Sequence, residues 1–476
     1  MNKMSLKAIS RPQSEILKIV PYSGIQFLSY GFDIEQTGRF SRSFTEHQRM
    51  DLRNAEGVVP FELRPNWNDD DPELDPPFPP QNNDVVYDIS KQKALEAFLG
   101  QWTPIPYFAV QSSRDTYGRE LLHQGPSNWA RARVSIAEPG NPSGHTHHVV
   151  LALDTDLIER RPNRPYVAPS PQDAIAEHEF VFASLFRDLA WFLSETRAAS
   201  DQQGNVNHQE WVDRWIDELF TEFKVAQRGR ALRPDDRQPL EHAARYIAFI
   251  QFLAVAAPLP RIKLIDTLSE DPSVKPVNVD LVLDVGNSRT CGMLVENFPN
   301  QEKIELGNSY VLQLRDLEEP HQVYTDPFES AVQLAQAQFG KEYLSRFSTR
   351  TRAFFWPSLV RVGPEAARYR EKAEGTEGAS GMSSPKRYLC DVEPVNQEWR
   401  FQPSDYGANR EPPTVDRATR RFVNYRGDVL RQFADERRFY ERLAWTPNRS
   451  ELDKPAARLT FSRSSFFTFM VAEILV

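Results

Sequence analysis

One segment in the second half of the chain, residues 280–296, constrains the fold more than any other. It reads DLVLDVGNSRTCGMLVE, in which two apolar runs, Leu281–Leu283 and Met293–Val295, flank a polar stretch that contains glycine. Short continuous apolar runs are typical of buried strands, and glycine beside asparagine and serine is typical of a tight turn. The segment therefore predicts a β-hairpin with two buried strands and a polar tip.

The tip of this hairpin carries groups that suit an anion. Gly286 lets the backbone approach a ligand closely, and successive backbone N–H groups in such a turn form a concave nest for anionic oxygens. Asn287, Ser288 and Thr290 add side-chain donors, and Arg289 adds a charge-assisted contact to phosphate. These five residues are therefore the candidate cofactor-binding residues of a phosphate-binding hairpin.

A carboxylate, Asp284, ends the first strand of the hairpin. It would repel a phosphate, so it fits the site only if a Mg²⁺ ion and its waters lie between the two. The pattern GxxxxGK[ST] of the Walker-type loop is missing. An ordinary hairpin, whose turn residues serve only the backbone conformation, stays open as the alternative.

The order of motifs in the second half resembles the superfamily of actin, DnaK-type chaperones and sugar kinases. The pattern DxGNS/T is similar to their first phosphate motif, and Trp356–Val360 is similar to the Pro-Ser strand that follows it in the chaperones. Val362–Gly363 and Ala366–Ala367 are similar to the Val-Gly and Ala residues that come next. Pro385–Leu389, after a glycine-rich loop, is similar to a segment whose lysine reaches the γ-phosphate.

This resemblance implies roles for individual residues. It implies Lys386 and Asp284 as the catalytic residues, ATP and Mg²⁺ as the cofactors, and Asp284 as the metal ligand, through water. The glycine-rich loop that precedes the lysine reads GTEGASGMSS.

A closer resemblance is to the SrfB family of bacterial virulence-associated proteins. The phrases PYSGIQFLSYG, LVLDVGNSRTCGML, FFWPSLVRVGPEAAR and GTEGASGMSSPKRYL all look like that family. The resemblance implies a family-specific N-terminal region followed by an actin-like ATPase domain. It also implies a link to virulence, but it fixes no biochemical reaction.

The end of the chain reads SRSSFFTFMVAEILV, an apolar helical pattern without a C-terminal cap. The resemblance implies longer relatives, and no second DxGG-type loop follows residue 292. We therefore expect a truncation within a helix and only the first half of the nucleotide site in this chain.

The leading prediction is an ATP-binding, actin-like protein associated with bacterial virulence, with ATP hydrolysis expected only in a longer parent protein. Two alternatives stay open. One is a non-enzymatic interaction or scaffold protein whose N-terminal region binds a partner protein. The other is a small-molecule kinase, because the DVGNSRT turn also resembles the first motif of type III pantothenate kinases.

Composition limits the partners and the compartment. The chain has 476 residues and a formal net charge of −9, which favours two or more domains and argues against a nucleic-acid partner. Cys291 and Cys390 cannot build a disulfide framework, and the N-terminus lacks an apolar stretch of signal-peptide length. Tyr246–Pro260 is too short to span a bilayer. We expect no membrane span and a cytoplasmic location, although a non-classical export route would leave no sequence trace.

We expect three regions in an α/β protein with an α+β N-terminal region. Residues 1–170 are a family-specific mixed α/β region with an Asp/Pro-rich loop at 64–84. Residues 171–276 are a helical subdomain that ends in a hinge at Asp271–Pro276. Residues 277–476 are a partial actin-like ATPase domain, which resembles the first lobe of the actin-like (ribonuclease H-like) fold and is incomplete.

Local patterns predict several elements in the first half. Strands are expected at 24–34, 105–110, 131–136, 147–154 and 261–266, and helices at 173–195, 210–225 and about 240–256. In the second helix, Trp211, Trp215, Leu219 and Phe223 recur every four residues. We interpret this aromatic stripe as core packing rather than as a groove for a partner.

Other candidate sites are weaker. His145 and His147 would share a face of a strand, but two ligands do not make a metal site. Glu177–Glu179 is expected on a helix that faces solvent, and Asp69–Asp71 lacks the glycine and the distal glutamate of an EF-hand loop. Cys291 is expected to be a small core residue.

Overall fold

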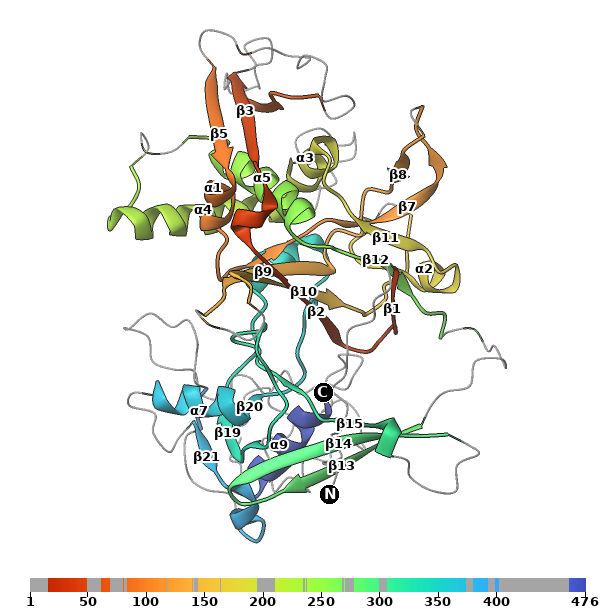
Figure 1. Ribbon diagram of the computed structural model, residues 1–476, viewed down its shortest axis with the longest axis vertical. Helices are drawn as coiled ribbons and strands as arrows, with labels where there is room; N and C mark the ends of the chain where they lie inside the picture. Colours follow the sequence, from red (N-terminus) through yellow and green to blue (C-terminus); the bar gives the residue numbers. More distant parts are fainter. Residues whose placement is uncertain are drawn as a thin grey trace, which may run out of the picture. The chain divides into compact units, whose positions relative to one another are not determined.

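The structure is a computed structural model of the chain, shown in Figure 1. It describes residues 16–48, 61–68, 80, 84–116, 118–138, 140, 144–162, 164–194, 210–233, 236, 238–267, 269, 278–298, 306–373, 380–392, 399–401 and 462–476. The acidic run Asp69–Asp71, most of the loop at 64–84, the hinge Asp271–Pro276 and residues 375–379 of the glycine-rich loop lie outside these ranges.

The chain divides into two compact units. The N-terminal unit comprises Ser14–Ser269 together with Phe339–Phe354, and the C-terminal unit contains Glu270–Gln338 and Phe355–Val476. Both combine helices with small sheets, which confirms the predicted mixed α/β class. The segment 339–354 therefore belongs to the N-terminal unit although it follows the hairpin in sequence.

Three sheets build the N-terminal unit, in the strand orders β1-β12-β11-β7-β8, β2-β10-β9-β6 and β4-β3-β5. Their strands are β1 (Ile16–Ile19), β2 (Ile25–Phe32), β3 (Ser41–Gln48), β4 (Phe61–Pro65), β5 (Val85–Ser90), β6 (Trp102–Pro104), β7 (Tyr107–Arg114), β8 (Glu120–Leu122), β9 (Ala130–Ile136), β10 (His147–Asp154), β11 (Glu179–Phe182) and β12 (Arg261–Leu264). The expected strands at 24–34, 105–110, 131–136, 147–154 and 261–266 are thus confirmed, with shifted ends.

The helices of this unit are η1 (Ile34–Thr37), α1 (Lys91–Glu96), α2 (Pro171–Ile175), α3 (Phe186–Ser194), α4 (Glu210–Arg228), α5 (Glu241–Ala256), α6 (Glu342–Ser345) and η5 (Arg346–Ser348). Helices α4 and α5 confirm two of the predictions, and they contact each other in the unit (Figure 1). Trp211 and Trp215 of α4 are fully buried in one core that also includes residues of the sheets. Leu219 is buried in the same core and Phe223 packs against it, so the aromatic stripe is core, as predicted. The helices and strands of residues 14–269 belong to one compact unit, whereas a boundary at residue 170 was expected from the sequence.

The prediction of one helix over 173–195 is wrong. Helix α2 ends before Glu177, whose φ of 47° is left-handed, and β11 follows before α3 begins. Strand β11 pairs with β7 and β12, and its Phe180 is fully buried in the core. Glu179 is likewise on a strand rather than on a helix, where it pairs with Arg261 at 2.8 Å. Cross-strand pairing outweighs the helical spacing of apolar residues here.

The C-terminal unit contains smaller sheets, in the orders β13-β14-β15 with β18 on β14, β16-β17 and β20-β19-β21. Its strands are β13 (Asn278–Val285), β14 (Arg289–Asn297), β15 (Ser309–Val311), β16 (Leu314–Arg315), β17 (Val323–Tyr324), β18 (Phe328–Glu329), β19 (Ala331–Leu334), β20 (Val360–Val362) and β21 (Gly381–Ser383). Its helices are η4 (Leu306–Asn308), α7 (Gly363–Glu371), η6 (Pro385–Tyr388) and α9 (Ser465–Leu475). Helix α9 confirms the expected helical pattern near Val476.

A compact core holds this unit together. Helix α7 contacts β19 and β20, and α9 contacts β20. Phe466 and Met470 of α9 are buried with Val332 and Val360 of these strands, and Val285 at the end of β13 packs against them. This packing fixes one end of the hairpin β13–β14, the long green ribbons of Figure 1.

Candidate functional site

The predicted hairpin is present. Strands β13 and β14 are antiparallel, with Val285 opposite Thr290 and Asp284 opposite Cys291. The backbone N–H of Gly286 donates to the carbonyl oxygen of Arg289 at 2.9 Å, which leaves Asn287 and Ser288 as a two-residue loop. A Cβ atom at position 286 would lie 2.7 Å from the carbonyl oxygen of Arg289, so this closing pair requires glycine.

The first strand of the hairpin is less buried than predicted. Strand β13 is at the edge of its sheet, and the side chain of Val282 is 49% exposed, whereas Leu281 and Leu283 are half-buried. The prediction of a buried run at 281–283 is therefore wrong for Val282, because alternate residues of a strand face opposite sides and one side of β13 is open. Cys291, opposite Asp284, is also exposed, which corrects its assignment as a core residue.

The tip of the hairpin leaves several polar groups exposed. The side chains of Asp284, Asn287, Ser288 and Arg289 are exposed, and within the described residues none of them makes an ion pair or a side-chain hydrogen bond. The backbone N–H groups of Asn287 and Ser288 likewise have no acceptor in the described part of the chain. Two neighbouring N–H groups and four polar side chains are thus available to a ligand at the tip of the hairpin.

Ser330, which was not predicted from the sequence, holds the turn through two hydrogen bonds to its backbone. Its N–H donates to the carbonyl oxygen of Ser288 at 2.9 Å, and its hydroxyl donates to the carbonyl oxygen of Gly286 at 2.9 Å. The Ser330 and Thr290 hydroxyl oxygens are 2.9 Å apart, and both residues are buried. Thr290 therefore points into the protein and supports the turn, while Asn287, Ser288 and Arg289 are exposed at the tip and Gly286 is half-buried. No local pattern around Ser330 signals this role, because it depends on a contact 40 residues away.

Lys386 is brought to the same hairpin. Its Nζ atom donates to the carbonyl oxygen of Val285 at 2.7 Å across 101 residues of sequence. The connection runs through Ser330, whose carbonyl oxygen accepts the N–H of Ser384 at 2.7 Å just before η6. An ammonium group has three N–H donors, so two remain for a ligand. The structure thus brings together the predicted residues 284–290 and Lys386 around one turn.

The serine–threonine contact gives a test of how the turn is held. Ser330→Ala is expected to lower the free energy of unfolding by about 1–3 kcal/mol, because it leaves the buried Thr290 hydroxyl without its partner. The double variant Ser330→Ala/Thr290→Val is expected to lose less than the sum of the two single changes. Urea unfolding measures all three, and Ser288→Ala, an exposed serine of the same turn, serves as the control with a change within about 0.5 kcal/mol. Additive losses would contradict this direct contact.

The histidines considered as metal ligands contact neighbouring side chains in the structure. His145 lies 3.3 Å from Asp33, and His147 stacks on Phe32 and contacts the Thr146 hydroxyl. Within the described ranges no group of three or more His, Cys, Asp or Glu residues could hold a metal ion. Among these same residues, no helix is both long and apolar enough to cross a membrane.

The fold and the hairpin together define a mixed α/β protein with a Gly-Asn-Ser turn that is buttressed by a buried serine and approached by a lysine. The comparisons with known proteins then specify the family. The family model described as "Virulence factor SrfB" matches residues 6–476, so the chain belongs to the SrfB virulence factor family. No curated protein and no solved structure matches the chain.

Proposed function

We propose that this SrfB protein binds ATP with Mg²⁺ and that the β13–β14 turn holds the phosphates. The observation that carries the proposal is the position of Lys386, whose Nζ lies 2.7 Å from the backbone of the turn. A lysine beside a turn with exposed N–H groups is a combination that recognises phosphate, since both supply donors and positive charge. The resemblance of the ordered motifs to the actin and DnaK-type superfamily supports the same reading.

Each residue has a role in this proposal. The N–H groups of Asn287 and Ser288 and their side chains donate to phosphate oxygens. Arg289 and Lys386 add the charge-assisted contacts, and Lys386 exchanges its exposed hydrogen bond to Val285 for one to the ligand, because one oxygen acceptor replaces another. Gly286, Thr290 and Ser330 hold the turn in shape.

Asp284 suits the metal. Its carboxylate is exposed at the end of β13 and makes no ion pair within the described ranges, and oxygen atoms are the ligands that Mg²⁺ prefers. Bound Mg²⁺ would offset the repulsion between this carboxylate and the phosphates. ATP hydrolysis is the reaction that the superfamily resemblance implies, with Lys386 and Asp284 as its catalytic residues.

Binding of a fluorescent ATP analogue to the unmodified protein, with and without Mg²⁺, tests the proposal. Lys386→Ala is expected to weaken binding by about 10–100-fold, because it removes a charged donor to phosphate. Asp284→Ala is expected to abolish the dependence on Mg²⁺. Release of inorganic phosphate measures hydrolysis in the same samples.

Two matched variants separate the site from general charge effects. Lys372→Ala removes an exposed lysine of the same unit, and Asp280→Ala removes a carboxylate four residues before Asp284 on β13. Both are expected to bind like the unmodified protein. Absence of nucleotide binding, or an equal loss with Lys372→Ala and Lys386→Ala, would refute the proposal.

A further inference from the structure

A cavity in the N-terminal unit points to a further site. We propose that this cavity, lined by arginines, binds a small molecule that carries two or more anionic oxygens. It has a volume of about 470 Å³ and is lined by residues 157–161 and 164–168 together with Thr349. Cavities of this size are typical of small-molecule sites. The proposal does not depend on the nucleotide hairpin, which belongs to the other unit.

Charge is the first argument. Arg160, Arg161 and Arg164 line the cavity, and Glu159 is the acidic residue among the lining residues, so three positive charges and one negative charge leave +2. None of the three arginines makes an ion pair within the described residues. In a chain whose net charge is −9, this concentration of unpaired guanidinium groups is a local exception. A guanidinium presents paired N–H donors that match carboxylate and phosphate oxygens.

One of these arginines is held in position. The guanidinium carbon of Arg160 lies 4.1 Å from the ring centroid of Tyr166. The Tyr166 hydroxyl donates to Asp173 at 2.9 Å, and Asp173 also accepts the N–H of Ser170 at 2.7 Å in the capping box of α2. Residue 125 must be glycine here, because a Cβ atom would lie 2.5 Å from the carbonyl oxygen of Tyr166. The ring is therefore a rigid platform, and Arg160 loses little freedom when it binds a ligand.

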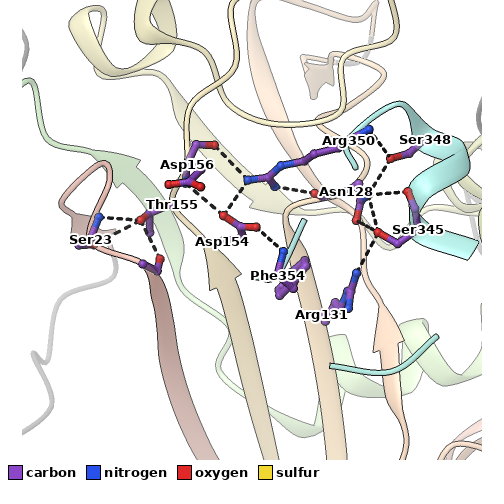
Figure 2. Close-up of polar contacts among 11 residues, drawn as sticks. Ser23, Asn128, Arg131, Asp154, Thr155, Asp156, Ser345, Ser348, Arg350 and Phe354 are labelled. Atoms are coloured by element: carbon purple, nitrogen blue, oxygen red, sulfur yellow. Dashed lines mark hydrogen bonds and ion pairs between the residues drawn. The ribbon is translucent and has the colours of Figure 1, made fainter. Parts of the chain in front are cut away.

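The opposite wall is held by the polar network of Figure 2. Thr349 has a φ of 74°, which is rare for a β-branched residue, and it lies between two anchored neighbours. Ser348 accepts a hydrogen bond from Asn128 Nδ2 at 2.7 Å, and Arg350 pairs with Asp154 at 2.7 Å. The backbone N–H of Asn128 donates to the carbonyl oxygen of Val167 at 2.8 Å. Asn128 thus connects both walls, so the cavity exists before any ligand arrives.

The residues that line the cavity indicate the class of ligand. Tyr166, Val167 and Leu157 add apolar surface beside the arginines, which suits an organic phosphate or a polycarboxylate. The volume accommodates a small molecule rather than a macromolecule. Organic phosphates and polycarboxylates share the same requirement, two or more anionic oxygens within reach of several guanidinium groups.

Calorimetric titration of the full chain with pyrophosphate and with citrate, at constant ionic strength, tests the proposal. At least one probe is expected to bind, and the comparison tells phosphate from carboxylate. Arg160→Ala is expected to weaken binding by about 10–100-fold. Arg160→Lys keeps the positive charge but lacks the paired N–H donors of a guanidinium, so an intermediate loss of affinity is expected.

Arg39→Ala is the matched control, since Arg39 is an exposed arginine of the same unit outside the cavity. It is expected to bind both probes like the unmodified chain. Because Arg160 is itself exposed, circular dichroism should show that its variants fold normally. Failure of both probes to bind, or an equal loss with Arg39→Ala, would overturn the proposal.

Discussion

Asp154→Ala is expected to lower the free energy of unfolding of the N-terminal unit by about 3–5 kcal/mol, the cost of leaving a buried charge without its partner. Asp154 and Arg350 are both 4% exposed, and their charged atoms are 2.7 Å apart. Asp154 also accepts the N–H of Phe354 at 2.6 Å. This one substitution therefore removes the carboxylate that neutralises the buried Arg350 charge, and it also removes the acceptor of the Phe354 N–H (Figure 2).

The loss should be local. Arg350 also donates to the backbone carbonyl oxygens of Asn128, at 2.7 Å, and Asp156, at 3.2 Å, so its guanidinium fastens residues 339–354 to the ends of β9 and β10. Hydrogen exchange measured on peptides of the chain should show deprotection of residues 339–354 first. Peptides of the hairpin β13–β14 are expected to exchange as before.

Asp156→Asn is the matched control. Burial, and then the neighbouring carboxylate of Asp154, raises the pKa of Asp156 to about 6. Near neutral pH the folded protein therefore holds this carboxylate charged at some cost, and its removal should leave stability unchanged or slightly higher. A loss with Asp156→Asn as large as that with Asp154→Ala would show that the ion pair is not what holds this segment.

The second large effect concerns pH and Glu365 in the C-terminal unit. Burial raises the pKa of Glu365 to about 8, against the opposing charge of Arg361, while Asp316 and Glu473 add to the rise. The carboxyl oxygens accept the N–H groups of Leu317 and Glu318, both at 3.1 Å, which limits the rise.

The sign of the pH effect follows from proton binding. Between the unfolded pKa of 4.5 and the folded pKa of about 8, the folded state binds more protons at Glu365 than the unfolded state. Stability from this group is therefore greatest at low pH and falls as pH rises through that window, by about 3–5 kcal/mol in total.

Glu365→Gln should remove this dependence, because an amide stays neutral while its oxygen still accepts a backbone N–H. Urea unfolding of both proteins from about pH 5 to about pH 9 should show the variant gaining stability relative to the unmodified chain as pH rises. Glu371→Gln, an exposed position on the same helix, should track the unmodified chain throughout. Parallel curves for Glu365→Gln and the unmodified chain would contradict the assignment.

Local patterns predicted the elements that depend on neighbouring residues. The hairpin at 284–292 follows from apolar runs around a Gly-Asn-Ser turn, and α4 follows from aromatic residues at helical spacing. Both signals lie within about 20 residues of sequence. Prediction failed at residues 173–195, where β11 pairs with strands that are distant in the chain.

The residues of the candidate site likewise divide into those that local sequence predicts and those that depend on distant contacts. Gly286, Asn287, Ser288 and Arg289 were readable from the turn, whereas Lys386 came from the resemblance of ordered motifs. Ser330 gave no local signal, because a serine before a short strand is unremarkable until its hydroxyl is found on the turn. The exposure of Cys291 was likewise hidden, since the apolar runs around it suggested a buried sheet.

The sequence by itself thus determined the hairpin, its polar tip and the two long helices, because backbone hydrogen bonds and alternating burial are set by residues close in the chain. Only the tertiary structure decided that Ser330 and Lys386 meet the turn and that residues 339–354 are bound by Asp154 and Asn128. The physical reason is that a buried polar group needs a hydrogen-bond partner, and the fold can supply that partner from 40 to 200 residues away in the chain.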